Sequence, residues 1–231
     1  LSGVASWVTD TYAAMPEALR HENLLLAETA FFIITGWLIP PLPGENLPEY
    51  VDRATQGDPA ALVKQMESLW VEKFDQHGKH LAALDLPDAR QIFRDREQFV
   101  AFMVAVNEDT EHVDLWNEAF DLLQQPDLFV ARLRRHIHAI WDDYLGEEWA
   151  RQLPLLNESI QAFQRVNLHD MTIYDAIRAV AGRDMRGKLD ELEADIDEVI
   201  FTPAPHLGPY IAKLPSGNTL RVLYGARLPR G

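Results

Sequence analysis

The chain has 231 residues, of which 47% are hydrophobic and 25% are charged, a composition typical of folded globular proteins. Lys and Arg number 21 against 36 Asp and Glu, which gives a formal net charge of −15. This charge argues against direct binding of a nucleic-acid backbone, which favours basic surfaces. The chain has no cysteine, which excludes disulfides, thiolate nucleophiles and cysteine-ligated zinc. The lack of cysteine is compatible with the cytoplasm, which we take as the expected location.

One stretch, residues 24–42, is long and apolar and contains a single charged residue, Glu28. A membrane-spanning helix needs about 20 consecutive apolar residues. Here Gly36 and the pair Pro40-Pro41 interrupt the run. We therefore predict a helix that is buried on several faces in a folded core, and no membrane contact.

From about residue 58 onward, the start and stop signals of amphipathic helices follow one another. Asp58-Pro59 is typical of a helix start, and Asp88 resembles the first residue of a capping box. Asp170 could begin the last helix, and Gly182 is placed to end it. The apolar stripes predict helices over residues 59–74, 88–106, 113–123, 128–145, 147–166 and 170–182.

The pattern changes to that of β-strands near the end of the chain. Residues 198–201 form a short apolar run, and residues 210–214 and 219–224 alternate between apolar and polar. The second alternating segment has Leu220, Val222 and Tyr224 on one face. The first has its apolar residues on one face and Lys213 on the other. Proline and glycine between the two segments predict a β-hairpin.

An isolated hairpin is only marginally stable in water, so this one should pack on the helices or on a partner chain. The expected fold is therefore mainly α: a multi-helix domain with a small C-terminal β-hairpin or three-stranded element. We place a helical domain at residues 1–195 and the β element at residues 196–228, where it leads into a linker-like tail.

Motifs for catalysis and for metal binding are weak in this sequence. Residues 182–188 spell most of a phosphate-binding loop but follow a predicted helix rather than a strand, which favours a turn between helices. His136 and His138, two residues apart on a helix, point about 200° apart and cannot share one ion. His77 and His80 could do so, although exposed polar residues in a turn explain them equally well. We predict no catalytic residue, no metal site and no cofactor.

Two further groups of side chains are candidates for ligand binding. Arg132, Arg135 and His136 share one face of a predicted helix. They could bind an anion. The favoured interpretation is that this face is solvated, or that its basic side chains pair with some of the many carboxylates. The aromatic residues Trp141, Tyr144 and Trp149 lie close along the chain, on both sides of Gly146.

Aromatic residues at helical spacing usually belong to the core, but rigid rings also line cavities for apolar or flat ligands. We name Trp141, Tyr144 and Trp149 as the candidate ligand-binding residues. A small apolar or aromatic effector is the ligand expected there.

Several segments of the chain are similar to a known family of proteins. They are WDDYLGEEW at residues 141–149, with Pro154-Leu-Leu156 after it, and VIFTPAPHLGPY at residues 199–210, with the predicted hairpin after it. Together they resemble the long amino-terminal region of bacterial transcriptional regulators in which a helical domain closes with a short β-hairpin. In that family an ArsR-type winged helix-turn-helix follows. The resemblance covers roughly residues 85–228.

The resemblance implies a regulatory domain that senses an effector, forms a homodimer, or does both, without being an enzyme. It implies contact with DNA only through the winged helix, because nothing after Phe201 in this sequence supplies a recognition helix. An effector would favour one arrangement of the helices, and the hairpin and linker would pass that bias to the DNA-binding module.

Two other functions stay open. One is a small-molecule-binding enzyme of unknown reaction, for which His112 and His136 near carboxylates are the first residues to consider. The other is a helical adaptor for protein interactions, which predicts an exposed apolar patch on the order of several hundred Å².

Overall fold

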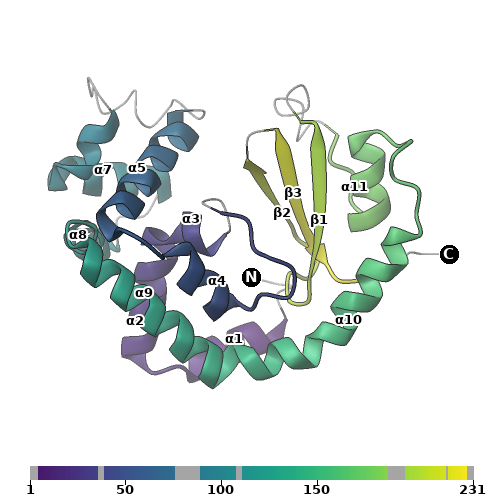
Figure 1. Ribbon diagram of the computed structural model, residues 1–231, viewed down its shortest axis with the longest axis horizontal. Coiled ribbons are helices and arrows are strands. Elements are labelled where there is room, and N and C mark those ends of the chain that lie inside the picture. The colour runs from purple at the N-terminus through teal and green to yellow at the C-terminus, as the bar shows by residue number, and fades with distance from the viewer. Residues whose placement is uncertain are drawn as a thin grey trace. The chain divides into compact units, whose positions relative to one another are not determined.

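The computed structural model describes residues 5–35, 39–75, 89–107, 111–186, 196–216 and 218–227. These residues confirm a mainly α fold with a small, three-stranded mixed sheet near the C-terminus (Figure 1). The chain divides into two compact units: unit 1 consists of Leu1–Met15 and Tyr144–Gly231, and unit 2 consists of Pro16–Asp143. The predicted boundary at residue 195 falls inside unit 1.

Unit 2 is built from helices that surround α9. Its elements are α2 (Glu17–Thr29), α3 (Phe31–Ile34), α4 (Leu47–Ala54), α5 (Pro59–Asp75), the 3₁₀ helix η1 (Ala89–Phe93), α7 (Arg96–Asn107), α8 (Val113–Leu123) and α9 (Pro126–Ile140). α9 contacts α2, α4, α5 and α8. Its inner face carries Phe129, Leu133 and Ile137, which are spaced four residues apart and are buried. This spacing makes α9 the centre of the core of unit 2.

The apolar stretch over residues 24–42 contributes to this core. Leu25, Leu26 and Ile33 are completely buried on α2 and α3. The buried hydroxyl of Tyr50 on α4 donates hydrogen bonds to the backbone oxygens of Ile33 at 2.7 Å and Ile39 at 3.1 Å. In the part of the chain that the structure describes, no helix combines the length and the hydropathy that crossing a bilayer requires.

At two helix starts in unit 2, the capping residues predicted from the sequence can be compared with those in the structure. Asp58 caps α5 as predicted, because its Oδ1 accepts a hydrogen bond from the backbone N–H of Ala60 at 3.1 Å. The helix predicted from Asp88 begins later: η1 comes first, and Asp95 caps α7 by accepting from the N–H of Gln98 at 3.1 Å. Asp88 itself lies outside the described residues.

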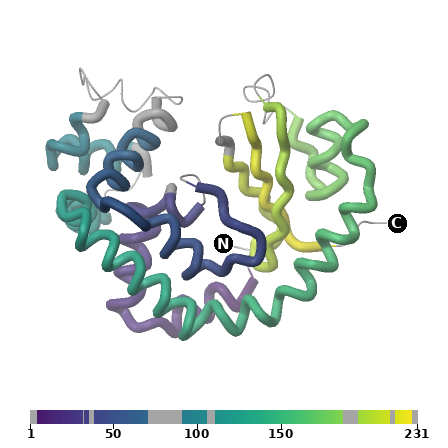
Figure 2. The backbone as a smooth tube through the Cα atoms, viewed as in Figure 1, coloured from purple at the N-terminus to yellow at the C-terminus, as the bar shows by residue number. Residues whose placement is uncertain are grey.

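Unit 1 combines helices with the sheet. Its elements are α1 (Ser6–Ala14), α10 (Gly146–Gln164), α11 (Ile173–Ala181), β1 (Glu198–Ala204), β2 (Ile211–Ser216) and β3 (Thr219–Gly225). The π-helical turn η2 (Trp141–Leu145) precedes α10, and the boundary between the units falls within it. β3 is the central strand, antiparallel to β2 in the predicted hairpin and parallel to β1 (Figure 2).

The sheet packs on α10 and α11 through the apolar face of β3. Leu220, Val222 and Tyr224 alternate along the strand and are buried, as the sequence predicts. Directly paired residues share a face of the sheet. Because Ile211 pairs with Tyr224 and Lys213 pairs with Val222, the face of β2 on the helix side is that of Lys213. The apolar residues on the opposite face of β2 therefore point away from the helices and do not extend the buried face of β3.

Candidate functional site

Unit 1 contains a cavity of about 930 Å³, a size found in small-molecule sites. Its walls come from the C-terminal end of α10, the loop over residues 165–172, the first turns of α11, and residues 196–201 at the start of β1. The apolar part of the lining consists of Phe163, Val166, Leu168, Met171, Ile173, Ala176, Ile196, Val199 and Phe201. Both helices and the sheet therefore contribute apolar surface to one cavity.

Polar groups complete the lining of the cavity. They are Gln164, Arg165, Asn167, His169, Asp197 and Glu198. The carboxylate of Asp197 accepts a hydrogen bond from Asn218 at 2.6 Å, and that of Glu198 accepts one from Thr219 at 3.2 Å. A cavity lined by both apolar and hydrogen-bonding groups suits a small amphipathic organic molecule.

The loop beside the cavity is set by the residues that end α10 and begin α11. Thr172 caps α11, because its hydroxyl accepts a hydrogen bond from the N–H of Asp175 at 3.2 Å. The predicted cap, Asp170, is not the capping residue, since its carboxylate accepts from the side chain of Asn167 at 2.6 Å within the loop. Gly182 ends α11 in the left-handed conformation with φ of 72°, as predicted.

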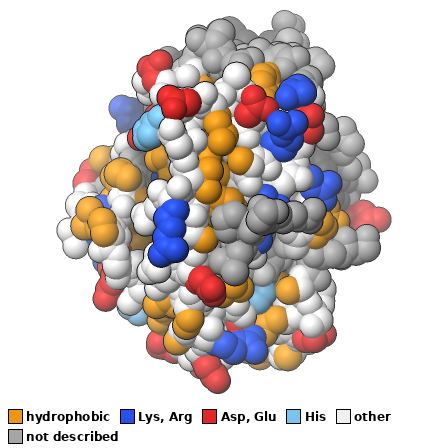
Figure 3. All heavy atoms as spheres, turned by 90° about the vertical axis from the view of Figure 1, so that its right-hand side faces the viewer, with side chains coloured by type: hydrophobic (Ala, Val, Ile, Leu, Met, Phe, Trp, Pro, Cys, Tyr) orange, Lys and Arg blue, Asp and Glu red, His pale blue; other side chains and the backbone are white. Residues whose placement is uncertain are grey.

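Figure 3 shows the surface on the side of α11. Hydrophobic side chains form a central strip there, and acidic and basic side chains lie around it. Met171, which lines the cavity, is 39% exposed. The cavity therefore has an apolar residue within reach of solvent.

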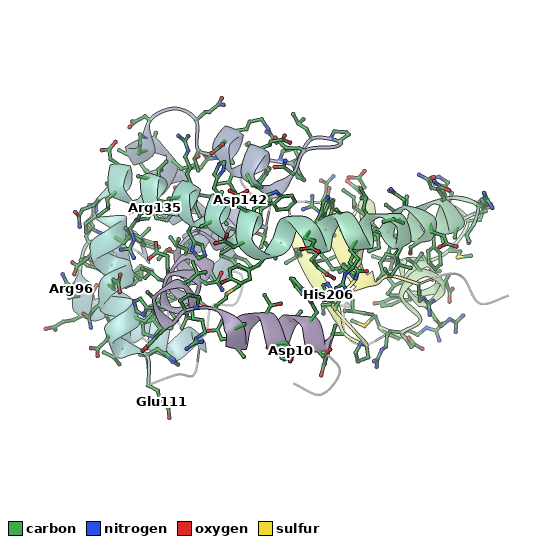
Figure 4. The ribbon with its side chains drawn as sticks, turned by 90° about the horizontal axis from the view of Figure 1, so that it is seen from below. Asp10, Arg96, Glu111, Arg135, Asp142 and His206 are labelled. Atoms are coloured by element: carbon green, nitrogen blue, oxygen red, sulfur yellow. The ribbon has the colours of Figure 1, made fainter. Side chains whose placement is uncertain are left out.

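A second cluster in unit 1 joins α1, α10 and the loop between β1 and β2. His206, which is labelled in Figure 4, lies on that loop, and its ring stacks on Trp7 of α1 with the ring centres 4.8 Å apart. Its Nε2 lies 2.7 Å from Oε1 of Glu148, a buried residue of α10. Arg151 and Gln152 donate hydrogen bonds to the same carboxylate. This cluster fastens three segments of unit 1 to one another.

The carboxylate of Glu148 is held in its ionised form. Burial by itself would raise its pKa, but the hydrogen bonds from Gln152 and Arg151 and the charges of Arg151 and His206 bring the pKa below its ordinary value of 4.5. The stabilisation it gives is thus fully present above about pH 4.5 and is lost as the pH falls through the lowered pKa.

We expect the substitution Glu148→Gln to lower the free energy of unfolding by about 1 to 2 kcal/mol at pH 7, because charge-assisted hydrogen bonds are lost. The difference from the wild type should shrink as the pH is lowered from 7 to 3, because the stabilisation by the carboxylate is lost in the direction of protonation. Urea denaturation at both pH values measures this effect. Glu147→Gln, at an exposed neighbouring position, serves as the control; equal stability of the two variants at pH 7 would contradict the expectation.

The structure places the predicted ligand-binding aromatics outside the cavity. Trp141 and Tyr144 are half-buried on η2, and Trp149 on α10 is 44% exposed. Trp141 belongs to unit 2, whereas Tyr144 and Trp149 belong to unit 1. None of these three residues lines the cavity described above, and their role in binding stays a prediction.

The basic residues of α9 differ in their partners within unit 2. Arg132 pairs with Glu22 of α2 and with Glu118 of α8, in the latter case at 3.0 Å. Arg134 donates to the hydroxyl of Thr55 at 2.7 Å, whereas Arg135, labelled in Figure 4, is exposed. Of the three residues on the face that could have bound an anion, Arg132 is therefore engaged by acidic side chains of its own unit.

The histidines named from the sequence take different positions. His136 is buried, with its Nε2 3.1 Å from Oδ1 of Asn23, and burial lowers its pKa against the smaller opposing effect of Glu22. His112 is exposed before α8. His77 and His80 lie outside the described residues. Within the described parts of the chain, no three His, Asp or Glu side chains are grouped so that they could hold a metal ion.

Comparison with known proteins finds no family model, no curated protein and no solved structure that matches this chain. The function is therefore inferred from the fold and from the cavity of unit 1.

Proposed function

We propose that this chain is the regulatory domain of a bacterial transcriptional regulator, binds a small apolar or aromatic effector in the cavity of unit 1, and forms a homodimer. It acts by binding, without catalysing a reaction, and DNA is contacted through an ArsR-type winged-helix domain outside this sequence. The mainly α fold that closes with a C-terminal sheet supports this proposal, since it is the architecture that the resemblance implies.

The observation that carries the proposal is the position of the cavity between the helices and β1. β1 pairs along its whole length with β3, which is the central strand of the sheet and the last strand in the sequence. A ligand in the cavity contacts α10, α11 and β1 at the same time. If two arrangements of these elements differ in affinity for the ligand, binding increases the population of the arrangement with the higher affinity. The net charge of −15 suits a module that stays off DNA while an attached domain binds it.

A reporter experiment tests this function. The chain is fused in front of a monomeric DNA-binding domain that represses a reporter only when it is paired, and small aromatic and aliphatic acids are added to the cells. We expect the fusion to repress, because the regulatory domain brings two copies together, and at least one compound to change repression. Light scattering of the purified chain should give twice its mass of 26.3 kDa.

Matched variants connect the response to the cavity. Ala176→Met fills the cavity from α11, where Ala176 is buried, and should abolish the response to the compound while repression persists. Ala150→Met changes an exposed position of α10 and should leave the response intact. A monomeric chain whose fusion represses no better than the DNA-binding domain alone would overturn the proposal.

A further inference from the structure

The chain that follows β3 is held against α10 by a buried serine. The hydroxyl of Ser159, which is completely buried, donates to the backbone oxygen of Arg227 at 2.7 Å. The hydroxyl oxygen of Ser159, Oγ, also accepts a hydrogen bond from the backbone N–H of Arg227 at 3.3 Å. It lies 3.2 Å from the hydroxyl of Tyr224. One serine thus satisfies both backbone groups of Arg227.

The side chain of Arg227 is held by α11. Its Nε donates to the backbone oxygen of Val180 and its Nη2 to that of Ala179, each at 2.8 Å. These carbonyls belong to the last turn of α11, where a helix has unsatisfied acceptors and favours a positive charge. A Cβ at Gly182 would lie 2.2 Å from Nη1 of Arg227, so the glycine leaves space for the guanidinium. We call the contacts of Arg227 with Ser159, Ala179 and Val180 the Arg227 latch.

Phe163 belongs both to the wall of the cavity and to the surroundings of the latch. Phe163 lines the cavity from α10, and the residue is buried. The ring centre lies 5.9 Å from Cζ of Arg227, within the range of a cation–π contact. The ring of Tyr224 meets the ring of Phe163 edge-on at 5.8 Å. A change in the position of Phe163 therefore alters both the wall of the cavity and the contacts with Arg227 and Tyr224.

We infer that Phe163 couples the cavity to the Arg227 latch, so that a ligand in the cavity changes how firmly the chain after β3 is held on α10 and α11. The inference rests on the effector site of the proposed function and adds the route by which occupancy reaches the C-terminal residues. The coupling is reciprocal, so loosening the latch also changes the affinity of the cavity.

Hydrogen exchange at Arg227, followed by NMR on the full chain, tests without a ligand whether Phe163 holds the latch closed. The backbone N–H and the Nε–H of Arg227 exchange only when the latch opens, so their rates report its open fraction. Phe163→Leu keeps an apolar side chain in the wall but removes the aromatic face, and both protons should exchange about two- to fivefold faster. Val199→Ala perturbs the cavity from β1 and should change the exchange less than twofold. Equal rates in the two variants would overturn the inference.

The aromatic sulfonate 1-anilinonaphthalene-8-sulfonate serves as the probe for occupancy. Its fluorescence reports binding, and binding should weaken in Ala176→Met, whose cavity is filled. We expect the bound probe to change the exchange at Arg227 at least twofold in the wild type and less in Phe163→Leu. Binding that leaves the exchange unchanged would overturn the coupling but not the effector site. Absence of binding would count against the effector site, and the comparison of Phe163→Leu with Val199→Ala would still decide whether Phe163 holds the latch.

Discussion

Replacing Gly225 by Ala is expected to lower the free energy of unfolding by about 2 to 3 kcal/mol, because the new methyl group meets rigid backbone. A Cβ at Gly225, the last residue of β3, would lie 2.5 Å from the backbone oxygen of Gly208. That oxygen belongs to the loop between β1 and β2 and cannot turn away as the end of a long side chain can. Urea denaturation followed by circular dichroism measures the loss.

Two observations separate this expectation from a general weakening of the strand. Thr219→Ala, at the other end of β3, changes a half-buried surface residue and should alter stability by less than about 1 kcal/mol. In Gly225→Ala the loop that carries His206 must move, so the NMR signals of the His206 ring should shift as its stack on Trp7 changes. A loss below about 0.5 kcal/mol with unshifted His206 signals would show that the contact does not restrict this position.

Local sequence signals predict most of the helices and the hairpin, because their causes lie within a few residues. Apolar spacing predicts α8, α9 and α10, and Gly182 ends α11 where a left-handed residue is required. The errors concern choices between neighbouring candidates. Thr172 caps α11 instead of Asp170, and a 3₁₀ helix delays the start of α7. Short polar side chains two residues apart offer nearly equal caps, and tertiary packing selects between them.

Pairing between distant segments is harder to predict from the sequence. The parallel pairing of β1 with β3 has no local turn to announce it. Alternation in β2 correctly separates two faces, but the register places Lys213 on the buried side, opposite Val222. The long aliphatic part of a lysine can cover apolar surface while its charge reaches water. Alternation alone therefore cannot tell which face of an edge strand packs on the helices.

The candidate site shows the same limit. Trp141, Tyr144 and Trp149 attract attention because they are close in sequence, whereas the cavity gathers residues from α10, a loop, α11 and β1. Phe163 belongs to a predicted apolar stripe, but nothing in its spacing indicates that this residue lines a cavity. The tail from Gly225 onward is linker-like in composition, yet Arg227 is held by backbone carbonyls, and no side-chain pattern reveals such partners.

The substitution Gly182→Ala should lower the free energy of unfolding by about 2 to 4 kcal/mol through two separable effects. The left-handed backbone of Gly182, with φ of 72°, costs a residue with a Cβ about 1 to 2 kcal/mol. The methyl group also occupies the place of the Arg227 guanidinium, and each hydrogen bond lost to Ala179 or Val180 is worth about 0.5 to 1.5 kcal/mol. Urea denaturation measures the sum.

A double-mutant cycle with Arg227→Ala separates these effects. Without the guanidinium, Gly182→Ala should cost only the backbone strain of about 1 to 2 kcal/mol, so the interaction energy of the two substitutions equals the lost hydrogen bonds. Gly44→Ala is the matched control, because Gly44 has φ of 81° and nothing within 4 Å of its Cβ position. Its cost should be the same with and without Arg227. If Gly182→Ala also costs the same in both backgrounds, the guanidinium does not occupy the end of α11, and the part of the Arg227 latch formed with Ala179 and Val180 does not exist.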